Sequence, residues 1–331
     1  MATWLTRALF LALGLWLLWL VLSSTDLGAV VDQVLAIGLS GLALVVAIYA
    51  IEFVADTGAW LLACRHVPAS PRWLGRLLGV RLVGEVLNSV TPLGGFGGEP
   101  VKALLLRRHH GLGIEETAIS LILAKTANLL SMLLFLAVGF AFALGDSRLP
   151  APYKLLASSG LLALGVGVLG LYAVQRHRVP SRLTARLGRT RLGIRLLAVL
   201  HHVERFDERL ASFYVADRAR FAGAFGLALA NWVVGALGIY ATFALIGRPV
   251  SLVDAWIIET VAQLVRAATF FIPASLGAQE GAFVLLLDAL AGDAAAGLAA
   301  ALVRRARELV WLTSGVVAGA LYSARLPGRE K

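Results

Sequence analysis

The chain has 331 residues, of which 59% are hydrophobic and 15% are charged, and its mean hydropathy is +0.81. Soluble domains carry about 25% charged residues, so this composition excludes an ordinary soluble protein and predicts an all-α polytopic integral membrane protein. Lysine and arginine (30) outnumber aspartate and glutamate (20). Because no aromatic-interleaved basic module accompanies this charge, it argues against nucleic-acid binding and for cytoplasmic loops that face anionic lipid.

Six apolar runs are long enough to cross the hydrocarbon core, which takes about 20 helical residues. They cover approximately residues 4–22, 34–62, 117–144, 153–175, 221–247 and 294–321. Within the first run Arg7 precedes the apolar core, which is also the pattern of a signal peptide. Its length and the absence of an Ala-x-Ala cleavage site favour an uncleaved first helix instead.

Two further hydrophobic regions, at about 74–106 and 253–291, are interrupted in the middle by SVTPLGGFGGEPVK and FIPASLGAQEG. Non-helical backbone at membrane depth survives only inside protein or beside a polar cavity, and a pair of interrupted segments in corresponding halves is typical of a transporter's substrate site. Each region forms either a re-entrant hairpin or a pair of short helices, which gives eight to ten helices in all. The residues that break the helices are Pro92, Gly94, Gly95, Gly97, Gly98, Pro273, Gly277 and Gly281.

The distribution of basic residues predicts the topology of a single transmembrane domain over residues 1–331. Arg7 places the N-terminus in the cytoplasm, and the loop at 23–33, with Asp26 and Asp32 but no basic residue, lies outside. The two hairpins then enter from opposite faces, as an inverted repeat requires, and both termini are cytoplasmic. The arginine-rich connector at 176–220 is cytoplasmic and carries a surface amphipathic helix. The apolar face of that helix comprises Leu192, Leu196, Leu197, Leu200 and Val203.

Ionisable side chains at membrane depth cost about 2.5–3.5 kcal/mol each on insertion scales, so they are the candidates for function. The first half offers Glu52, Asp56, Arg81, Glu85, Asn88, Glu99, Lys102, Lys125 and Asn128. The second half offers Glu259, Gln263, Arg266, Gln279, Glu280, Arg304, Arg305, Arg307 and Glu308.

Glu99 and Pro100 follow a Gly-Gly pair and predict a helix start. The free N–H groups there either hold a phosphate that Lys102 neutralises, or Glu99 caps its own helix and pairs with Lys102. The i,i+4 spacing of Arg81 with Glu85, and of Arg304 with Glu308, predicts intrahelical ion pairs.

Basic residues outnumber acidic ones in the last span, which favours contact between one of its arginines and either an anionic headgroup or Glu280. The pair formed by Gly277 and Gly281 is typical of helix packing.

Few residues support catalysis, a cofactor or a metal. Cys64 is the only cysteine, and His109 and His110 near Glu115 are typical of a plain surface loop. No nucleophile has a base beside it in the sequence, and there is no H-E-x-x-H motif, so we expect neither an enzyme nor a metal or cofactor site.

Three blocks resemble a known family: NSVTPLGGFGGEPVKALLLRR at 88–108, FFIPASLGAQEGAFVLL at 270–286 and ALVRRAREL at 301–309. They are similar to the flippase-like transmembrane domain of lysylphosphatidylglycerol synthases, in particular to its stand-alone members, which include hopanoid-biosynthesis-associated membrane proteins. The resemblance implies a lipid-translocating or lipid-binding fold with two re-entrant elements. In the bifunctional synthases a cytoplasmic domain performs aminoacyl transfer, and because this chain ends soon after its last span, we do not expect that activity here.

These observations predict a flippase-like transporter in the bacterial inner membrane that handles a polar or anionic lipid headgroup in a central cavity. The residues expected to line that cavity are Glu99, Lys102, Gln279, Glu280, Arg304, Arg305 and Glu308. An ion-coupled transporter for a small polar solute would use the same broken helices. A non-transporting scaffold for lipid-biosynthesis enzymes is the other alternative.

Overall fold

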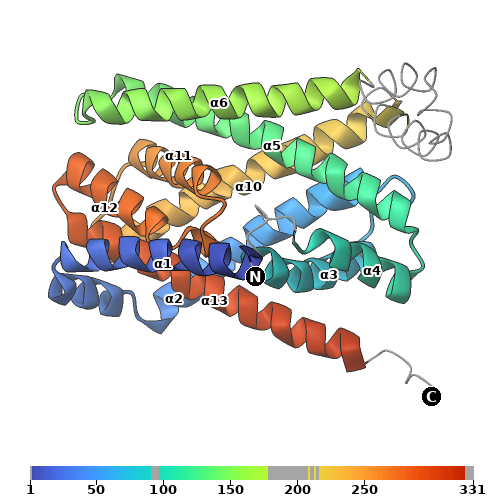
Figure 1. The fold of residues 1–331 in the computed structure, drawn as a ribbon, viewed down its shortest axis with the longest axis horizontal. Helices are drawn as coiled ribbons and strands as arrows, with labels where there is room; N and C mark the ends of the chain where they lie inside the picture. The colour runs from blue at the N-terminus through green and yellow to red at the C-terminus, as the bar shows by residue number, and fades with distance from the viewer. Residues whose placement is uncertain (1, 91–96, 178–207, 209–211, 214–215, 325–331) are drawn as a thin grey trace.

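The computed structural model describes residues 2–90, 97–177, 208, 212–213 and 216–324. In this part the chain is helical throughout, with ten α-helices and one short 3-10 helix (Figure 1). The helices are α1 (Ala2–Ser23), α2 (Leu27–Ala63), α3 (Pro71–Val90), α4 (Glu99–His110), α5 (Ile114–Gly145), α6 (Ala151–Arg176), α10 (Arg218–Leu245), α11 (Leu252–Ala268), η1 (Pro273–Ser275), α12 (Ala278–Ala291) and α13 (Ala294–Ala324).

Five of the described stretches are long and apolar enough to cross a membrane: Leu27–Ala63, Ile114–Gly145, Ala151–Arg176, Arg218–Leu245 and Pro273–Ala291. The last helix, α13, is 31 residues long, but charged residues at its centre lower its hydropathy. The predicted spans 4–22, 117–144, 153–175, 221–247 and 294–321 fall on α1, α5, α6, α10 and α13. The chain is therefore a polytopic helical membrane protein, as the composition predicts.

The beginning of α2 differs from the sequence-based prediction. The stretch 23–33 is not an extended outside loop, because α2 already begins at Leu27. Asp26 caps this helix by accepting hydrogen bonds from the backbone N–H groups of Gly28 (2.9 Å) and Ala29 (3.3 Å). Gly38 has a φ of 61° and separates the first turns from the rest of α2 by a kink. A polar residue that looks like part of a loop is thus a helix cap.

The two interrupted regions form hairpins at opposite ends of the helix bundle. In Figure 1, α3 and α4 lie at the right-hand end and α11 and α12 at the left-hand end. Helix α4 has 12 residues and α12 has 14. At 1.5 Å per residue these arms extend about 18–21 Å, which is too short to cross a hydrocarbon core of about 30 Å. Helices α4 and α12 alone are therefore too short to span, and the stretch Pro273–Ala291 reaches spanning length only when η1 is counted with α12.

The order of elements repeats between the two halves with opposite direction. Helix α2 is followed by the α3–α4 hairpin and by α5, and helix α10 is followed by the α11–α12 hairpin and by α13. Figure 1 shows that α2 and α10 run in opposite directions along the bundle and that α5 and α13 do the same. Helices α2 and α10 share the most extensive helix–helix contact in the described chain. This is the arrangement expected of an inverted repeat.

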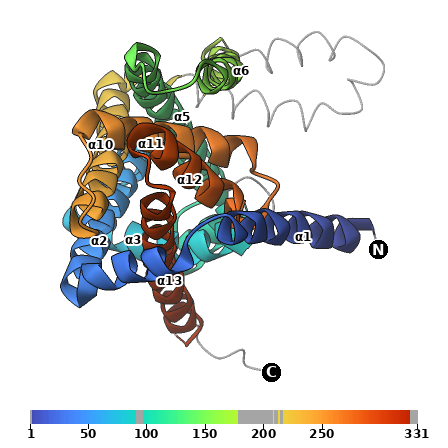
Figure 2. The ribbon, with the colours of Figure 1, turned by 90° about the vertical axis from the view of Figure 1, so that its left-hand side faces the viewer.

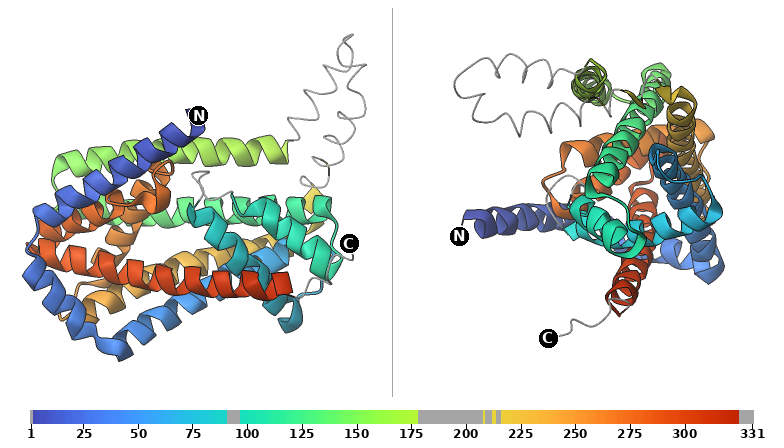
Figure 3. Two further views of the ribbon diagram at one scale, coloured as in Figure 1. Left: turned by 60° about the horizontal axis from the view of Figure 1, so that its bottom comes forward. Right: turned by 90° about the vertical axis from the view of Figure 1, so that its right-hand side faces the viewer.

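The core and the outer helices differ sharply in burial. The largest apolar cluster lies among α2, α10, α11, α12 and α13 and includes the fully buried Phe243, Ile257 and Phe283. Helix α6 instead exposes most of its leucines, and α1 projects from the side of the bundle (Figures 2 and 3). Exposed apolar helices of this kind fit a lipid environment, in which burial against protein is not required.

The predicted amphipathic helix of the 176–220 connector, with the leucines assigned to it, lies outside the described residues. The described flanks show α6 ending at Arg176 and α10 beginning at Arg218.

Candidate functional site

The second broken segment is a strained turn between α11 and α12. Ala274 and Ser275 have φ values of 51° and 49°, and Gly277 has a φ of 77°, so three residues adopt the left-handed region. Non-glycine residues in this region persist only when surrounding contacts fix them, and such strain is typical of functional sites. Pro273 begins η1 within this turn.

Arg305 of α13 fixes the second break through three separate hydrogen bonds. Its Nε donates to Glu280 Oε1 (2.6 Å), one terminal nitrogen donates to Glu308 Oε2 (2.8 Å), and the other donates to the carbonyl oxygen of Ala274 (2.8 Å). The guanidinium fork therefore joins the start of α12 to the strained turn. The side chain of Arg305 is 19% exposed, whereas that of Glu280 is 2% exposed.

Glu280 also caps its own helix. Its Oε2 accepts a hydrogen bond from the backbone N–H of Gly277 (2.8 Å), while Oε1 accepts from Arg305. The neighbouring Gln279 is buried and its side-chain amide donates to the carbonyl oxygen of Ala262 in α11 (3.4 Å). The two residues predicted to form one side of the site thus hold α12 against α13 and α11.

A side chain added at Gly277 would collide with the backbone of Leu18 and Gly14 in α1, and one added at Gly281 would contact Val21 of α1. This pair is therefore a helix-packing contact, as its spacing predicts.

The other two arginines of α13 are buried in ion pairs with different helices. Arg304 donates to Glu259 of α11 (2.6 Å), and Gln263 donates to the same carboxylate (2.6 Å). Arg307 donates to Glu52 of α2 (3.4 Å). The predicted intrahelical pair of Arg304 with Glu308 is wrong. Arg304 faces α11 and pairs with Glu259, and Glu308 pairs with Arg305 instead.

The predicted excess of positive charge in α13 is also neutralised in the structure. Each arginine of the helix contacts a carboxylate, and two of those carboxylates, Glu52 and Glu259, come from other spans. Several buried donors nevertheless have no hydrogen-bond partner in the described part of the chain: Nε of Arg304, Nε of Arg307 and Nε1 of Trp311. An unpaired buried donor costs about 1–3 kcal/mol, so this region retains the capacity to bind a polar group.

The first broken segment carries a parallel set of polar contacts. Arg81 of α3 pairs with Asp56 of α2 and donates to the carbonyl oxygen of Phe53 (3.2 Å). Asn128 of α5 donates to the same Asp56 (3.0 Å). The predicted pair of Arg81 with Glu85 is wrong, because the guanidinium turns across the helix interface and Glu85 accepts from Asn88 (3.2 Å).

The start of α4 lies directly against α3. Pro100 occupies its first turn, and Glu99 forms an ion pair with Lys102 (2.9 Å), as one of the two predicted arrangements requires. The backbone N–H of Gly98 donates to Asn88 Oδ1 (2.7 Å), and a side chain at Gly98 would collide with the backbone of Gly84. Gly98 is therefore required for the close crossing of α3 and α4. Gly97 lies in the turn before it, and Pro92, Gly94 and Gly95 lie outside the described residues.

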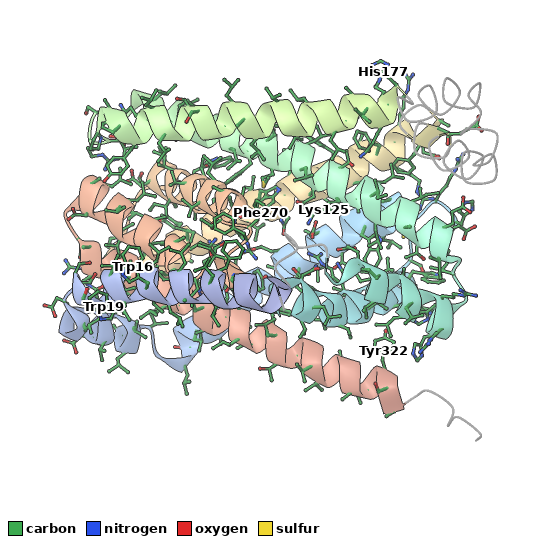
Figure 4. All side chains as sticks on the ribbon, in the orientation of Figure 1. Trp16, Trp19, Lys125, His177, Phe270 and Tyr322 are labelled. Carbon is green, nitrogen blue, oxygen red and sulfur yellow. The ribbon has the colours of Figure 1, made fainter. Side chains whose placement is uncertain are left out.

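Two acidic residues of α2 connect the two sets of contacts. Glu52 and Asp56 are one helical turn apart, and they pair with Arg307 of α13 and with Arg81 of α3, respectively. Lys125 of α5, which Figure 4 places midway along the bundle, lies in the electrostatic field of Glu85, Lys102, Glu99 and Asp56. We name the charged and amide residues of both sets the central polar network. Its members are Glu52, Asp56, Arg81, Glu85, Asn88, Glu99, Lys102, Lys125, Asn128, Glu259, Gln263, Glu280, Arg304, Arg305, Arg307 and Glu308.

Charge alone makes Glu52, Asp56 and Glu259 candidates, and their spacing predicts no partner for them. Two carboxylates at i,i+4 in an otherwise apolar helix were the available signal. Among the described residues there is no group of three or more His, Cys, Asp or Glu side chains placed to hold a metal ion.

Comparison with known proteins places the whole described bundle in one family. Residues 7–315 match the model of the lysylphosphatidylglycerol synthase TM region. A UPF0104 membrane protein of Methanothermobacter thermautotrophicus is 26% identical over 300 residues, which are 86% of this chain and 84% of that protein. No solved structure matches the chain. The chain therefore belongs to the family defined by the lysylphosphatidylglycerol synthase TM region, a membrane protein family linked to lipid handling.

Proposed function

We propose that this protein is a flippase-like transporter that moves a polar or anionic lipid headgroup through the central polar network while the acyl chains remain in the bilayer. The observation that carries the proposal is the contact of Arg305 with Glu280, Glu308 and the strained turn at Ala274. Broken helices with polar groups at membrane depth are the usual construction of a transporter's binding site. Membership of a family linked to lipid handling supports a lipid as the substrate.

The relative burial of the arginines indicates which of them exchanges partners. Arg304 and Glu259 are 6% and 4% exposed, so separating them would leave two buried charges uncompensated. Arg305 and Glu308 are 19% and 20% exposed. A headgroup phosphate can therefore replace the carboxylate of Glu308 at Arg305 at lower cost, since a guanidinium binds phosphate and carboxylate in the same bidentate way.

The surface beside Arg305 is suited to a molecule with an apolar tail. Phe270, at the start of the same break, is 60% exposed, and Arg266 one turn earlier is also exposed. Figure 4 shows Phe270 near the middle of the bundle's length. A headgroup at Arg305 would thus bind at the turn of Ala274, four residues after this exposed aromatic side chain, which is suited to contact an acyl chain.

We further propose that the protein acts without catalytic chemistry, cofactor or metal. Lipid-biosynthesis enzymes are its candidate protein partners. It lies in the bacterial plasma membrane with both termini in the cytoplasm, an orientation that rests on the positive-inside rule.

Native mass spectrometry of the purified full chain tests the class of substrate. Retention of phospholipid that is lost in Arg305→Ala and kept in Arg248→Ala would support the proposal, because Arg248 pairs with Asp293 away from the network. A bound small solute would instead favour an ion-coupled solute transporter. Retention of neither would favour a scaffold whose intramembrane charges are structural pairs.

A further inference from the structure

A second basic site lies at the end of the bundle, apart from the central polar network. There α3, the end of α4 and the end of α13 surround a cavity of about 510 Å³. Figure 4 labels Tyr322, which marks its α13 side. Its lining residues are Arg72, Gly75, Arg76, His109, His110 and Tyr322. We name this cavity the basic pocket.

The two arginines of the pocket have no carboxylate partner among the described residues. Arg72 and Arg76 are exposed and form no ion pair in the described part of the chain. The guanidinium of Arg76 instead lies 4.6 Å above the ring of Trp73. In contrast to the arginines of the central polar network, these two are available to an external anion.

The two histidines present buried, unpaired nitrogens. The Nε2 atoms of His109 and His110 are buried and have no hydrogen-bond partner in the described residues. Ring contacts fix their orientation: His109 meets Tyr322 edge-on at 5.0 Å, and His110 meets Trp73 at 6.0 Å. Buried polar atoms normally have partners, so two orphan nitrogens on histidines that line one cavity point to a bound group.

Helix dipoles explain only part of this arrangement. Arg107, Arg108, His109 and His110 end α4, where the negative end of the dipole favours positive charge. Arg72 lies in the first turn of α3, which contains no acidic residue and where the dipole disfavours a cation. An oxyanion would be favoured by both the arginines and the start of this 20-residue helix.

We propose that the basic pocket binds a phosphate group, carried by an anionic phospholipid headgroup or by a soluble phosphate. Arg72 and Arg76 supply guanidinium forks, and protonated Nε2 atoms of His109 and His110 supply two further donors. The proposal does not depend on the central polar network, because none of the lining residues belongs to that network.

Affinity for phosphate should rise as the pH falls. Burial, followed by the positive charge of Arg76 and by His109, lowers the pKa of His110, which ends α4 outside the spanning helices. A bound anion favours the protonated imidazolium, so binding takes up a proton and strengthens as pH falls through this pKa. The other titratable or charged groups that face His110 in the pocket are Arg72, Arg76, His109 and Tyr322.

The test uses the full chain and two phosphate probes. The chain has eight tryptophans, so the difference in fluorescence between it and Trp73→Phe isolates the signal of Trp73. This signal reports binding of inorganic phosphate to protein in detergent and of phosphatidylglycerol in nanodiscs, with phosphatidylcholine nanodiscs as the comparison without net charge. Arg76→Ala combined with His110→Ala should weaken binding at least tenfold. Gly75→Leu should block the pocket, because a side chain at Gly75 meets nothing within 4 Å and extends into the cavity. Arg176→Ala, at the end of α6 and outside both sites, should leave binding unchanged.

Binding of phosphatidylglycerol alone identifies the lipid headgroup as the source, and binding of inorganic phosphate identifies a soluble phosphate. The proposal is overturned if neither probe binds, if phosphatidylcholine produces the same response as phosphatidylglycerol, or if the pocket variants bind as tightly as the unmodified chain. Failure of lipid movement in Arg305→Ala with intact pocket binding would separate the two sites.

Discussion

Arg305 Nε lies 2.6 Å from Glu280 Oε1, and this contact joins the last helix to the first turn of the helix that follows the second break. The same arginine holds the carbonyl oxygen of Ala274 in the strained turn. One side chain therefore fixes both the start of α12 and the conformation of the backbone before it. A ligand that competes for Arg305 would release both together.

Glu280→Ala should loosen the second break without unfolding the bundle. The substitution removes the acceptor of the Gly277 N–H, which costs about 1–3 kcal/mol, while Arg305 keeps Glu308 and the Ala274 carbonyl. Hydrogen exchange should accelerate at residues 269–277. Glu308→Ala is the matched control, because Glu308 contacts the same arginine but not the turn. Equal acceleration in both variants would show that Glu280 does not hold the break.

Removing one partner of the buried pair of Arg304 with Glu259 should lower the free energy of unfolding, whereas replacing both partners together should change it much less. Arg304→Met alone leaves Glu259 buried without its partner and should cost about 3–5 kcal/mol in unfolding free energy. Arg304→Met combined with Glu259→Met removes both charges and should recover most of that loss. Denaturant unfolding in detergent measures the difference. A double variant as unstable as the single one would contradict a desolvated ion pair.

Gly277→Ala should disrupt the packing of α1 on the second break. The new methyl group would meet the backbone of Leu18 and Gly14, and a φ of 77° disfavours alanine, so a loss of about 1–3 kcal/mol is expected. Gly167→Ala provides the control, since a methyl group there meets nothing within 4 Å. Thermal unfolding of the two variants gives the comparison, and equal midpoints would mean that α1 does not need this close approach.

The loop between α5 and α6 should make a pH-dependent contribution to stability. Arg148 pairs with Asp146 (2.6 Å) and with Asp254 of α11, and the hydrogen bond from Arg148 lowers the pKa of Asp146. A lowered pKa means stability that is present above the ordinary aspartate value and is lost as pH falls through the folded value. Arg148→Ala should therefore lower the melting temperature at pH 7 and have less effect near pH 3. A constant difference across that range would exclude this linkage.

The two hairpins were predictable because glycine and proline interrupt a helix at their own positions, and the charge of a loop indicates the side of the membrane on which it lies. The breaks at Pro273 and Gly98 interrupt apolar runs. Basic residues flank the first region on both sides, whereas only Arg248 precedes the second, and this contrast predicts hairpins from opposite faces. The cap at Asp26 was missed because an aspartate after Ser23, Ser24 and Thr25 is equally typical of a loop, and only the hydrogen bonds to Gly28 and Ala29 distinguish the two.

The partners within the central polar network were not predictable from spacing. The i,i+4 rule pairs Arg304 with Glu308, but the rotation of α13 in the bundle turns Arg304 toward Glu259, 45 residues away. A buried charge must be paired with an opposite charge, and the packing of the helices decides which carboxylate lies beside it. Likewise, Glu52 and Asp56 join the two halves through Arg307 and Arg81, and these partners come together only when the helices pack.

The transbilayer movement of fluorescent phosphatidylglycerol in proteoliposomes shows whether Arg305 handles the lipid headgroup. Reconstituted wild-type protein and Arg248→Ala should expose inner-leaflet lipid to an external quencher at the same rate. Arg305→Ala should reduce the rate to that of protein-free vesicles while retaining the wild-type helical content. Movement at the wild-type rate in folded Arg305→Ala would show that Arg305 does not handle the headgroup.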